Sequence, residues 1–258
     1  MSETSSIFMI HGMWSSGDCW ARLRAHFEDR GHRVATPTLP FHNVTPDDAP
    51  PEGLGTASLI DYTDALEGEI RDFDRNAVII GHSMGGLLAQ KLAARGFGSK
   101  LACLAPAPSA GMFPFLPGPT RAFLRTSLTP GFWKKPHRAT WQEARWSVFN
   151  GGVPEEEARD EYAKYVHESG RALFELAMWY VDRRRATAVD RDAIDIPVLI
   201  MVGEDDRITP PAWARAAARG FGGRASYEEL PDTGHWLIGT PAWPDTARRL
   251  ERFIGTGR

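Results

Sequence analysis

The chain is poor in cysteine and has no long apolar run, and both scarcities exclude classes of protein. Its 258 residues include only two cysteines, Cys19 and Cys103, and these do not form a C-x-x-C pair. A disulfide framework and a zinc site of the usual spacing are therefore excluded, and two buried free thiols are expected. No apolar run approaches the roughly 20 residues of a membrane span. The start carries no basic segment followed by a long apolar one, so we expect no signal peptide and a cytoplasmic location.

Motifs for metals, nucleotides and nucleic acids are also missing. The sequence contains no H-E-x-x-H, no G-x-x-x-x-G-K-[ST] and no G-x-G-x-x-G after a strand. Its formal charge of −3 gives no basic footprint for nucleic acid. We therefore expect no cofactor, no metal, no nucleic-acid partner and no membrane, and a monomer or homodimer that acts on a small molecule.

The pattern of apolar segments predicts an α/β fold. The length admits one large α/β domain or two small ones. The expected strands lack polar alternation and are separated by amphipathic helices, which indicates a mainly parallel sheet with helices on both faces. The expected strands are 6–10, 32–36, 77–80, 100–104, 198–202 and 225–230. The expected helices are 18–30, 57–73, 84–95, 211–219 and 242–254.

Residues 107–187 interrupt this alternation and hold no convincing strand. Pro154 and the three glutamates after it mark a helix start. A second helix is expected over 169–184, with an apolar stripe and with the basic run 183–185 at its end. The stripe consists of Leu173, Leu176, Ala177 and Tyr180.

We interpret residues 107–187 as an all-helical cap inserted into a core domain of residues 1–106 and 188–258. The cap holds 13 of the 27 aromatic residues of the chain. Most of these are expected to build the small core of the cap itself. Some are expected to line a substrate pocket.

One motif carries nucleophile chemistry. Gly81-His82-Ser83-Met84-Gly85 is a G-x-S-x-G directly after an apolar strand and directly before a helix. A serine on so tight a turn adopts a strained backbone conformation, and the flanking positions must be small. The turn raises the hydroxyl above the sheet and places it at a helix N-terminus.

This motif, with His11-Gly12 upstream and Gly234-His235 downstream, resembles the α/β-hydrolase superfamily, in its serine-nucleophile, esterase/lipase-like branch. The resemblance covers nearly the whole chain outside the cap. It implies the α/β-hydrolase fold with a helical cap. Only six residues precede Ile7, so the initial antiparallel strands of larger members should be missing. This leaves roughly six parallel strands, as in the compact branch of small esterases, plant methyl-esterases and hydroxynitrile lyases.

A serine hydroxyl needs a base and an orienting acid. Of the eight histidines, His235 lies in the loop where the family places its base, whereas the side chain of His82 should leave on another side of the strand end. The acid is expected in the loop after strand 198–202, where three acidic residues are adjacent. The family pattern fits Asp206 better, and Asp205 stays open as the alternative.

The resemblance also assigns an oxyanion hole, whereas a pocket is predicted from the aromatic residues. The expected backbone N–H donors are those of Met13 and Met84. Trp14 could line the acyl pocket or only cover the edge of the sheet. The expected pocket residues are Trp14, Phe113, Phe115, Trp133 and Trp236.

These features predict a serine hydrolase that cleaves carboxylic esters of small to medium apolar or aromatic substrates through Ser83, His235 and Asp206. The serine at the elbow excludes the branches that need an aspartate there, haloalkane dehalogenases and epoxide hydrolases. Thioesterase, lactonase, amidase, C–C hydrolase or hydroxynitrile-lyase-like chemistry remains open, as does a non-catalytic ligand receptor on the same fold.

Overall fold

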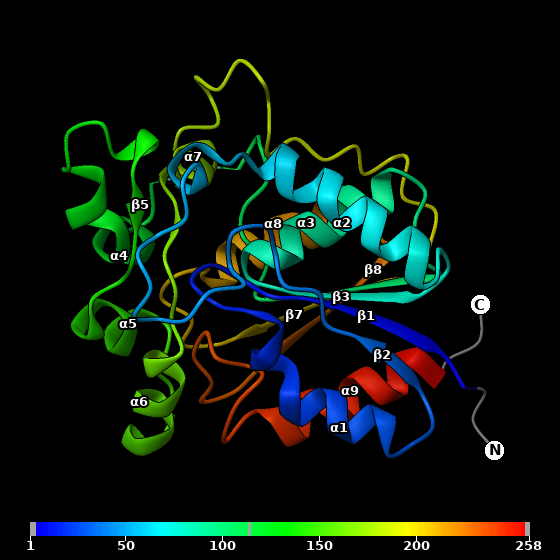
Figure 1. Cartoon of the computed structure of the whole chain (residues 1–258). Coiled ribbons are helices and arrows are strands. Elements are labelled where there is room, and N and C mark those ends of the chain that lie inside the picture. Colours follow the sequence, from blue (N-terminus) through cyan, green and yellow to red (C-terminus); the bar gives the residue numbers. More distant parts are fainter. Residues whose placement is uncertain (1–3, 113–114, 256–258) are drawn as a thin grey trace.

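The computed structural model describes residues 4–112 and 115–255. It shows an α/β domain with a cap at one end of the sheet (Figure 1). The core strands and helices lie within two residues of the expected bounds, except that α1 begins at Ala21, three residues after the expected start, because a 3₁₀ turn precedes it.

Within the described residues, the central sheet has six strands, all parallel, in the order β2-β1-β3-β4-β7-β8. The middle strands are buried along their whole length, as their continuous apolar sequence predicts. Among the residues that the structure describes, no antiparallel strand joins this sheet, as expected. The strands are β1 (Ser6–Ile10), β2 (Arg33–Ala35), β3 (Val78–His82), β4 (Lys100–Leu104), β7 (Val198–Gly203) and β8 (Ala225–Leu230).

Helices cover both faces of the sheet. α2, α3 and α8 lie over one face, and α1 and α9 lie over the other (Figure 1). A Ser58 capping box begins α2, in which the side chains of Ser58 and Asp61 exchange bonds with each other's backbone N–H groups. The core helices are α1 (Ala21–Glu28), α2 (Leu59–Phe73), α3 (Met84–Ala94), α8 (Pro211–Gly220) and α9 (Trp243–Gly255), with short 3₁₀ turns η1 (Gly17–Trp20) and η2 (Leu54–Thr56).

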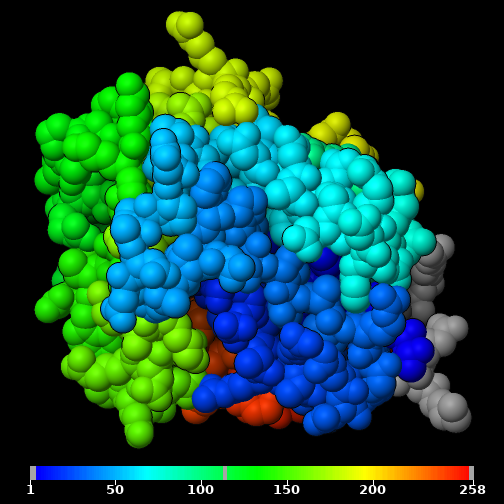
Figure 2. Space-filling model, viewed as in Figure 1, coloured from blue at the N-terminus to red at the C-terminus, as the bar shows by residue number. Residues whose placement is uncertain are grey.

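The cap lies beside the ends of the strands, past β1 and β3 (Figure 1). In the space-filling view it lies directly against the light-blue segment that precedes α2 (Figure 2). Its elements are α4 (Pro117–Ser127), η3 (Phe132–Lys134), β5 (Pro136–His137), α5 (Trp141–Ser147), α6 (Glu155–Ala163), β6 (Glu168–Ser169) and α7 (Gly170–Ala177).

The expectation of an all-helical cap is wrong in one respect. β5 and β6 pair antiparallel, with Pro136 opposite Ser169 and His137 opposite Glu168. Each strand has only two residues, too few for an alternating pattern to appear in the sequence. The pairing joins segments about 30 residues apart, which only the tertiary structure brings together.

The helix expected over 169–184 is also too long. α7 ends at Ala177, and Met178 has left the helical conformation with φ −121°. Beyond it, Asp182 accepts hydrogen bonds from the backbone N–H groups of Arg184 and Ala186, which forms a turn instead. The basic run 183–185 is therefore not a helix end, and Tyr180 is half-exposed rather than part of a buried stripe.

No helix in the described ranges combines the length and the apolar character that crossing a bilayer requires.

Candidate active site

Ser83 lies on the turn between β3 and α3 in a strained conformation, with φ 56° and ψ −122°. Its neighbours hold it there: the Ser83 N–H donates to the Leu104 carbonyl, and the Ser83 carbonyl accepts from Ala107. The flanking glycines are obligatory. A Cβ on Gly81 would lie 2.2 Å from the Gly85 carbonyl oxygen, and one on Gly85 would lie 2.2 Å from that of Ile10. The turn is thus the tight one that the sequence predicts.

Asp206 and His235 form a buried pair, with 2.8 Å between Asp206 Oδ2 and His235 Nδ1. Asp206 Oδ1 accepts from the backbone N–H groups of Ile208 and Thr209, and the Thr209 hydroxyl lies 2.8 Å from Oδ2. These contacts fix the carboxylate. Because His235 Nδ1 donates to it, Nε2 is left to accept a proton.

Asp205, the alternative acid, is exposed, and its backbone N–H donates to the Thr233 carbonyl. Only Asp206 of the adjacent acidic residues is buried with its carboxylate on His235. The geometry therefore favours Asp206.

His82 contacts His235, the expected base, at its backbone. Its Nε2 donates to the His235 carbonyl oxygen at 2.9 Å, and the two rings lie 4.7 Å apart between centroids. Burial, together with the neighbouring His235, lowers the pKa of His82 to about 3, so the ring is neutral. His82 thus helps to hold the backbone of His235, a role that sequence reasoning did not identify.

The expected oxyanion donors lie beside Ser83. Met84 is the first residue of α3, so its N–H is among those without a partner inside the helix. Gly12 touches the elbow: a Cβ there would lie 2.9 Å from Ser83 Cβ. The Met13 N–H belongs to the next peptide, in a loop that shares a cavity with Ser83.

His11 fixes the peptide that carries the Met13 N–H. The Leu39 N–H donates to His11 Nε2 at 3.0 Å, so Nδ1 is the protonated nitrogen and donates to the Gly12 carbonyl at 2.8 Å. Burial, with nearby His42, lowers the pKa of His11 to about 3 and keeps it neutral. In a trans peptide the N–H points opposite to the carbonyl, so this contact also sets the direction of the Met13 N–H.

Ser83, His82 and His235 open into one cavity of about 310 Å³ between the core and the cap. Its described lining contains no Asp, Glu, Lys or Arg. Such an apolar cavity with a few convergent polar groups is typical of a small-molecule site. Its aromatic lining consists of Trp14, Phe115, Phe123, Phe132, Tyr165, Trp213 and Trp236.

Three of the predicted pocket residues, Trp14, Phe115 and Trp236, line this cavity. Trp14 also stacks on Phe123 and Tyr165 from the cap, so it joins the core to the cap rather than only covering the sheet. Phe113 lies outside the described residues.

Trp133 does not belong to the cavity lining, contrary to expectation. It is 41% exposed and packs against the rings of Phe132 and Phe174. Phe132, its neighbour in η3, lines the cavity instead. Adjacent aromatic residues in a one-turn segment point to different sides, and the sequence does not say which side faces the pocket.

Further lining residues come from the apolar stripe of α7, which the sequence predicts but does not assign to the pocket. Leu173, Leu176 and Ala177 line the cavity, whereas a stripe of this spacing is also typical of a helix that packs on a core.

Both cysteines are free. Cys103 is buried and Cys19 partly so, and Cys19 also lines the cavity. Burial raises the pKa of each thiol to about 12, so neither supplies a thiolate nucleophile near neutral pH. Residues 4–112 and 115–255 hold no group of three His, Cys, Asp or Glu side chains arranged for a metal ion.

Comparison with known proteins agrees with this architecture. No curated protein matches the chain. Similar solved structures include a pyrethroid hydrolase from Sphingobium faniae, with 22% identity, a TM-score of 0.71 and coverage of 98% of both chains. A methylesterase from Arabidopsis has 13% identity and a TM-score of 0.71, over 97% of this chain and 99% of that chain. A monoacylglycerol lipase from Paleococcus ferrophilus has 18% identity and a TM-score of 0.66, over 96% of this chain and 93% of that chain.

At these identities the structures show a shared fold. A family model described as the alpha/beta hydrolase family matches residues 7–243, which include the elbow, the cap and the Asp206–His235 pair. The chain belongs to the alpha/beta hydrolase family.

Proposed function

We propose that the chain is a serine hydrolase that cleaves carboxylic esters of small to medium, uncharged, apolar or aromatic substrates. The observation that carries this proposal is the cavity itself. Ser83 and His235 line it, His235 is bonded to the buried Asp206, and the described lining has no charged Asp, Glu, Lys or Arg side chain. The similar structures are named as a hydrolase, a methylesterase and a lipase, which supports hydrolysis as the reaction class.

In the proposed reaction, Ser83 Oγ attacks the ester carbonyl while His235 Nε2 takes the hydroxyl proton. The Met13 and Met84 N–H groups donate to the oxyanion of the tetrahedral intermediate. His235 then gives the proton to the leaving alkoxide, so the alcohol departs and an acyl-enzyme remains. Water repeats the sequence: it loses a proton to His235, attacks the acyl carbonyl and releases the acid and free Ser83.

Asp206 acts through His235. Its carboxylate holds the imidazole with Nδ1–H toward Oδ2 and stabilises the positive ring that forms in each half-reaction. The neutral His82 beside it adds no competing charge.

The cavity also supports a preference for uncharged substrates. Transferring a carboxylate from water into an apolar cavity is unfavourable unless a cation pairs with it, and the described lining offers none. The aromatic rings provide the matching surface for apolar acyl or alcohol groups.

The test uses the purified protein, Ser83→Ala and, as a control, Ser127→Ala, which removes another cavity-lining serine from α4. We expect the wild type and S127A to hydrolyse p-nitrophenyl butyrate and to be labelled by a fluorophosphonate, and S83A to do neither. p-Nitrophenyl hemisuccinate, of similar size but charged, should be turned over with at least about 10-fold lower kcat/KM.

Turnover that survives S83A would refute the covalent mechanism, and equal turnover of both esters would refute the preference for uncharged substrates. No turnover and no labelling of the wild type would favour the ligand-receptor alternative.

A further inference from the structure

One loop of the cap lies against both loops that carry Asp206 and His235. We call residues 148–152, which follow α5, the cap loop. Val148, Phe149 and Asn150 are buried. The fit is close, because a Cβ on Gly151 would lie 2.0 Å from the Gly234 backbone nitrogen, and one on Gly234 would lie 2.4 Å from Asn150 Oδ1. The cap loop therefore packs directly on the residue that precedes His235.

Asn150 makes a polar contact between the cap loop and the segment that carries Asp206. Its Nδ2–H donates to the Asp205 carbonyl oxygen at 2.7 Å. That carbonyl belongs to the peptide joining Asp205 to Asp206. The amide orientation is set by this bond, because Oδ1 in place of Nδ2 would face another oxygen.

The same short segment is tied to the base loop. The Asp205 N–H donates to the Thr233 carbonyl at 2.9 Å, two residues before His235. Asp205 is thus held at its N–H by the base loop and at its carbonyl by Asn150. Its exposed carboxylate takes no part in this arrangement.

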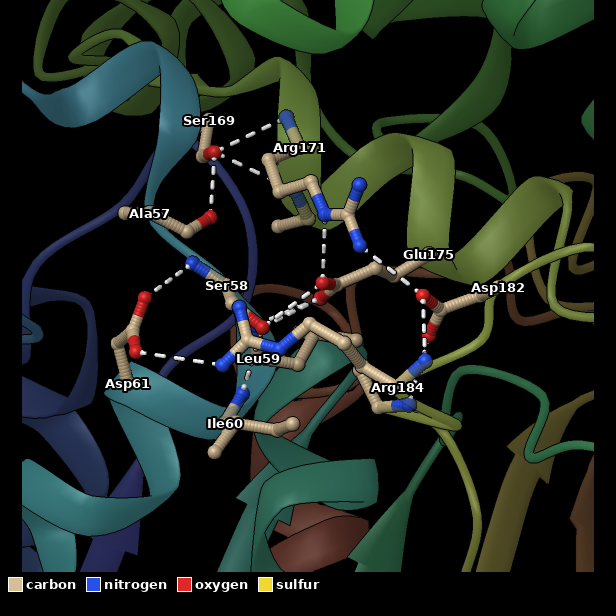
Figure 3. Close-up of polar contacts among 12 residues, drawn as sticks. Ala57, Ser58, Leu59, Ile60, Asp61, Ser169, Arg171, Glu175, Asp182 and Arg184 are labelled. Atoms are coloured by element: carbon tan, nitrogen blue, oxygen red, sulfur yellow. Dashed lines mark hydrogen bonds and ion pairs between the residues drawn. The ribbon is translucent and has the colours of Figure 1, made fainter.

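The cap is fixed to the core by buried hydrogen bonds, so the position of Asn150 relative to the core is also fixed. The fully buried Glu175 of α7 accepts from Ser58 Oγ and from the Leu59 N–H at the start of α2, each at 2.8 Å (Figure 3). Arg171 donates to the same carboxylate, and Ser169 Oγ donates to the Ala57 carbonyl (Figure 3).

A second attachment of the cap to the core is made by α6, which follows the cap loop in the sequence. Glu157 of α6 accepts a hydrogen bond from the Thr240 N–H and forms an ion pair with Arg22 of α1. The cap loop lies in the sequence between α5 and this attached helix.

From these contacts we infer that Asn150 is a positioning residue for catalysis: it holds the Asp205–Asp206 peptide so that the carboxylate stays aligned with His235. The inference rests on the proposed function. Asn150 does not line the substrate cavity, so its loss should change the chemical step and leave substrate binding unchanged.

The test compares Asn150→Ala and Asn150→Asp with Gln142→Ala, an exposed amide of α5 in the same cap segment. N150D keeps the shape of the side chain but cannot donate to the Asp205 carbonyl. Each enzyme is assayed with p-nitrophenyl butyrate per fluorophosphonate-titrated site. We expect both Asn150 variants to lose about 2- to 10-fold in kcat, the effect of one hydrogen bond, with KM unchanged and Q142A equal to the wild type.

A readout without substrate separates this inference from the proposed function. The proton between His235 Nδ1 and Asp206 should give a low-field ¹H NMR resonance, which we expect to shift or broaden in both Asn150 variants. If the wild type hydrolyses no ester, the proposed function fails and the resonance alone decides the positioning role.

Unchanged kcat and resonance in the variants would overturn the inference, even if their melting temperatures fall. So would a rise in KM alone, because it would place Asn150 in substrate binding. Should N150A fail to fold, N150S, which keeps a shorter hydrogen-bond donor, is measured in its place with the same two outcomes.

Discussion

Removing the carboxylate of Glu175 should loosen the cap from the core and lower the stability of the protein markedly. This side chain is fully buried, and it accepts hydrogen bonds from Ser58, Leu59 and Arg171. Truncation to alanine leaves these donors without their acceptor. Removing one partner of a buried ion pair costs about 3–5 kcal/mol. Arg171 is 25% exposed and keeps Asp182 as a second partner, so we take about 3 kcal/mol, the low end of that range.

The assay is thermal unfolding followed by circular dichroism at pH 7. One kcal/mol lowers the melting temperature of a domain of this size by about 2–4 °C, so Glu175→Ala should lower it by about 6–12 °C. Glu175→Gln should fall between E175A and the wild type, because it keeps one acceptor oxygen but loses the charge. The control is Glu156→Ala, which removes an exposed carboxylate from cap helix α6.

A shift below about 2 °C for E175A, comparable to that of E156A, would refute the reasoning. It would mean that water reaches these donors once the carboxylate is gone, and that the contacts in Figure 3 do not hold the cap.

Two further predictions concern the acid proposed to orient His235 and the buried ion pair between His42 and Glu168. Asp206→Asn should lower kcat on p-nitrophenyl butyrate by at least about 100-fold, whereas Asp205→Asn should change it less than 3-fold, because only Asp206 contacts His235; the reverse order would identify Asp205 as the acid. The second prediction concerns His42 and Glu168, whose side chains are fully buried with 3.1 Å between His42 Nε2 and Glu168 Oε2. Burial alone would lower the pKa of His42, but Glu168 raises it above the ordinary 6.5. Burial alone would raise the pKa of Glu168, but His42 and the hydrogen bonds from Ser169 and Tyr62 lower it below 4.5. Because its pKa is raised, His42 contributes stability that is full below pH 6.5 and is lost as the pH rises through the raised pKa. Because its pKa is lowered, Glu168 contributes stability that is full above pH 4.5 and is lost as the pH falls through the lowered pKa. The difference in melting temperature between the wild type and His42→Gln should therefore be largest between about pH 4.5 and 6.5 and smaller at pH 9; a difference independent of pH would show that the pair is not charged.

The core of the fold follows closely from local sequence. β1 and β4 occupy the expected ranges because continuous apolar runs bounded by polar residues have few alternatives to a buried strand. The turn at Ser83 could be predicted for a related reason: a serine between obligatory glycines, after a strand and before a helix, has a strict local geometry.

The cap follows its sequence less closely, because its elements are short. α7 ends at Ala177, and Asp182 accepts the hydrogen bonds of a separate turn beyond it, whereas β5 and β6 pair only with each other. Neither contact leaves a periodic pattern in the sequence.

The sequence by itself determined the parallel sheet and the tight turn at Ser83, since each depends on apolar periodicity or on the geometry of a single turn. The proposed base and the group of candidate acids were placed by the family resemblance, in loops that follow predicted strands. The tertiary structure decided which acid contacts His235, which aromatic side chains line the cavity and which buried groups join cap to core. His42 meets Glu168 across 126 residues, and Asn150 meets Asp205 across 55. The physical reason is that such contacts depend on where distant segments pack, and a local pattern cannot encode the partner.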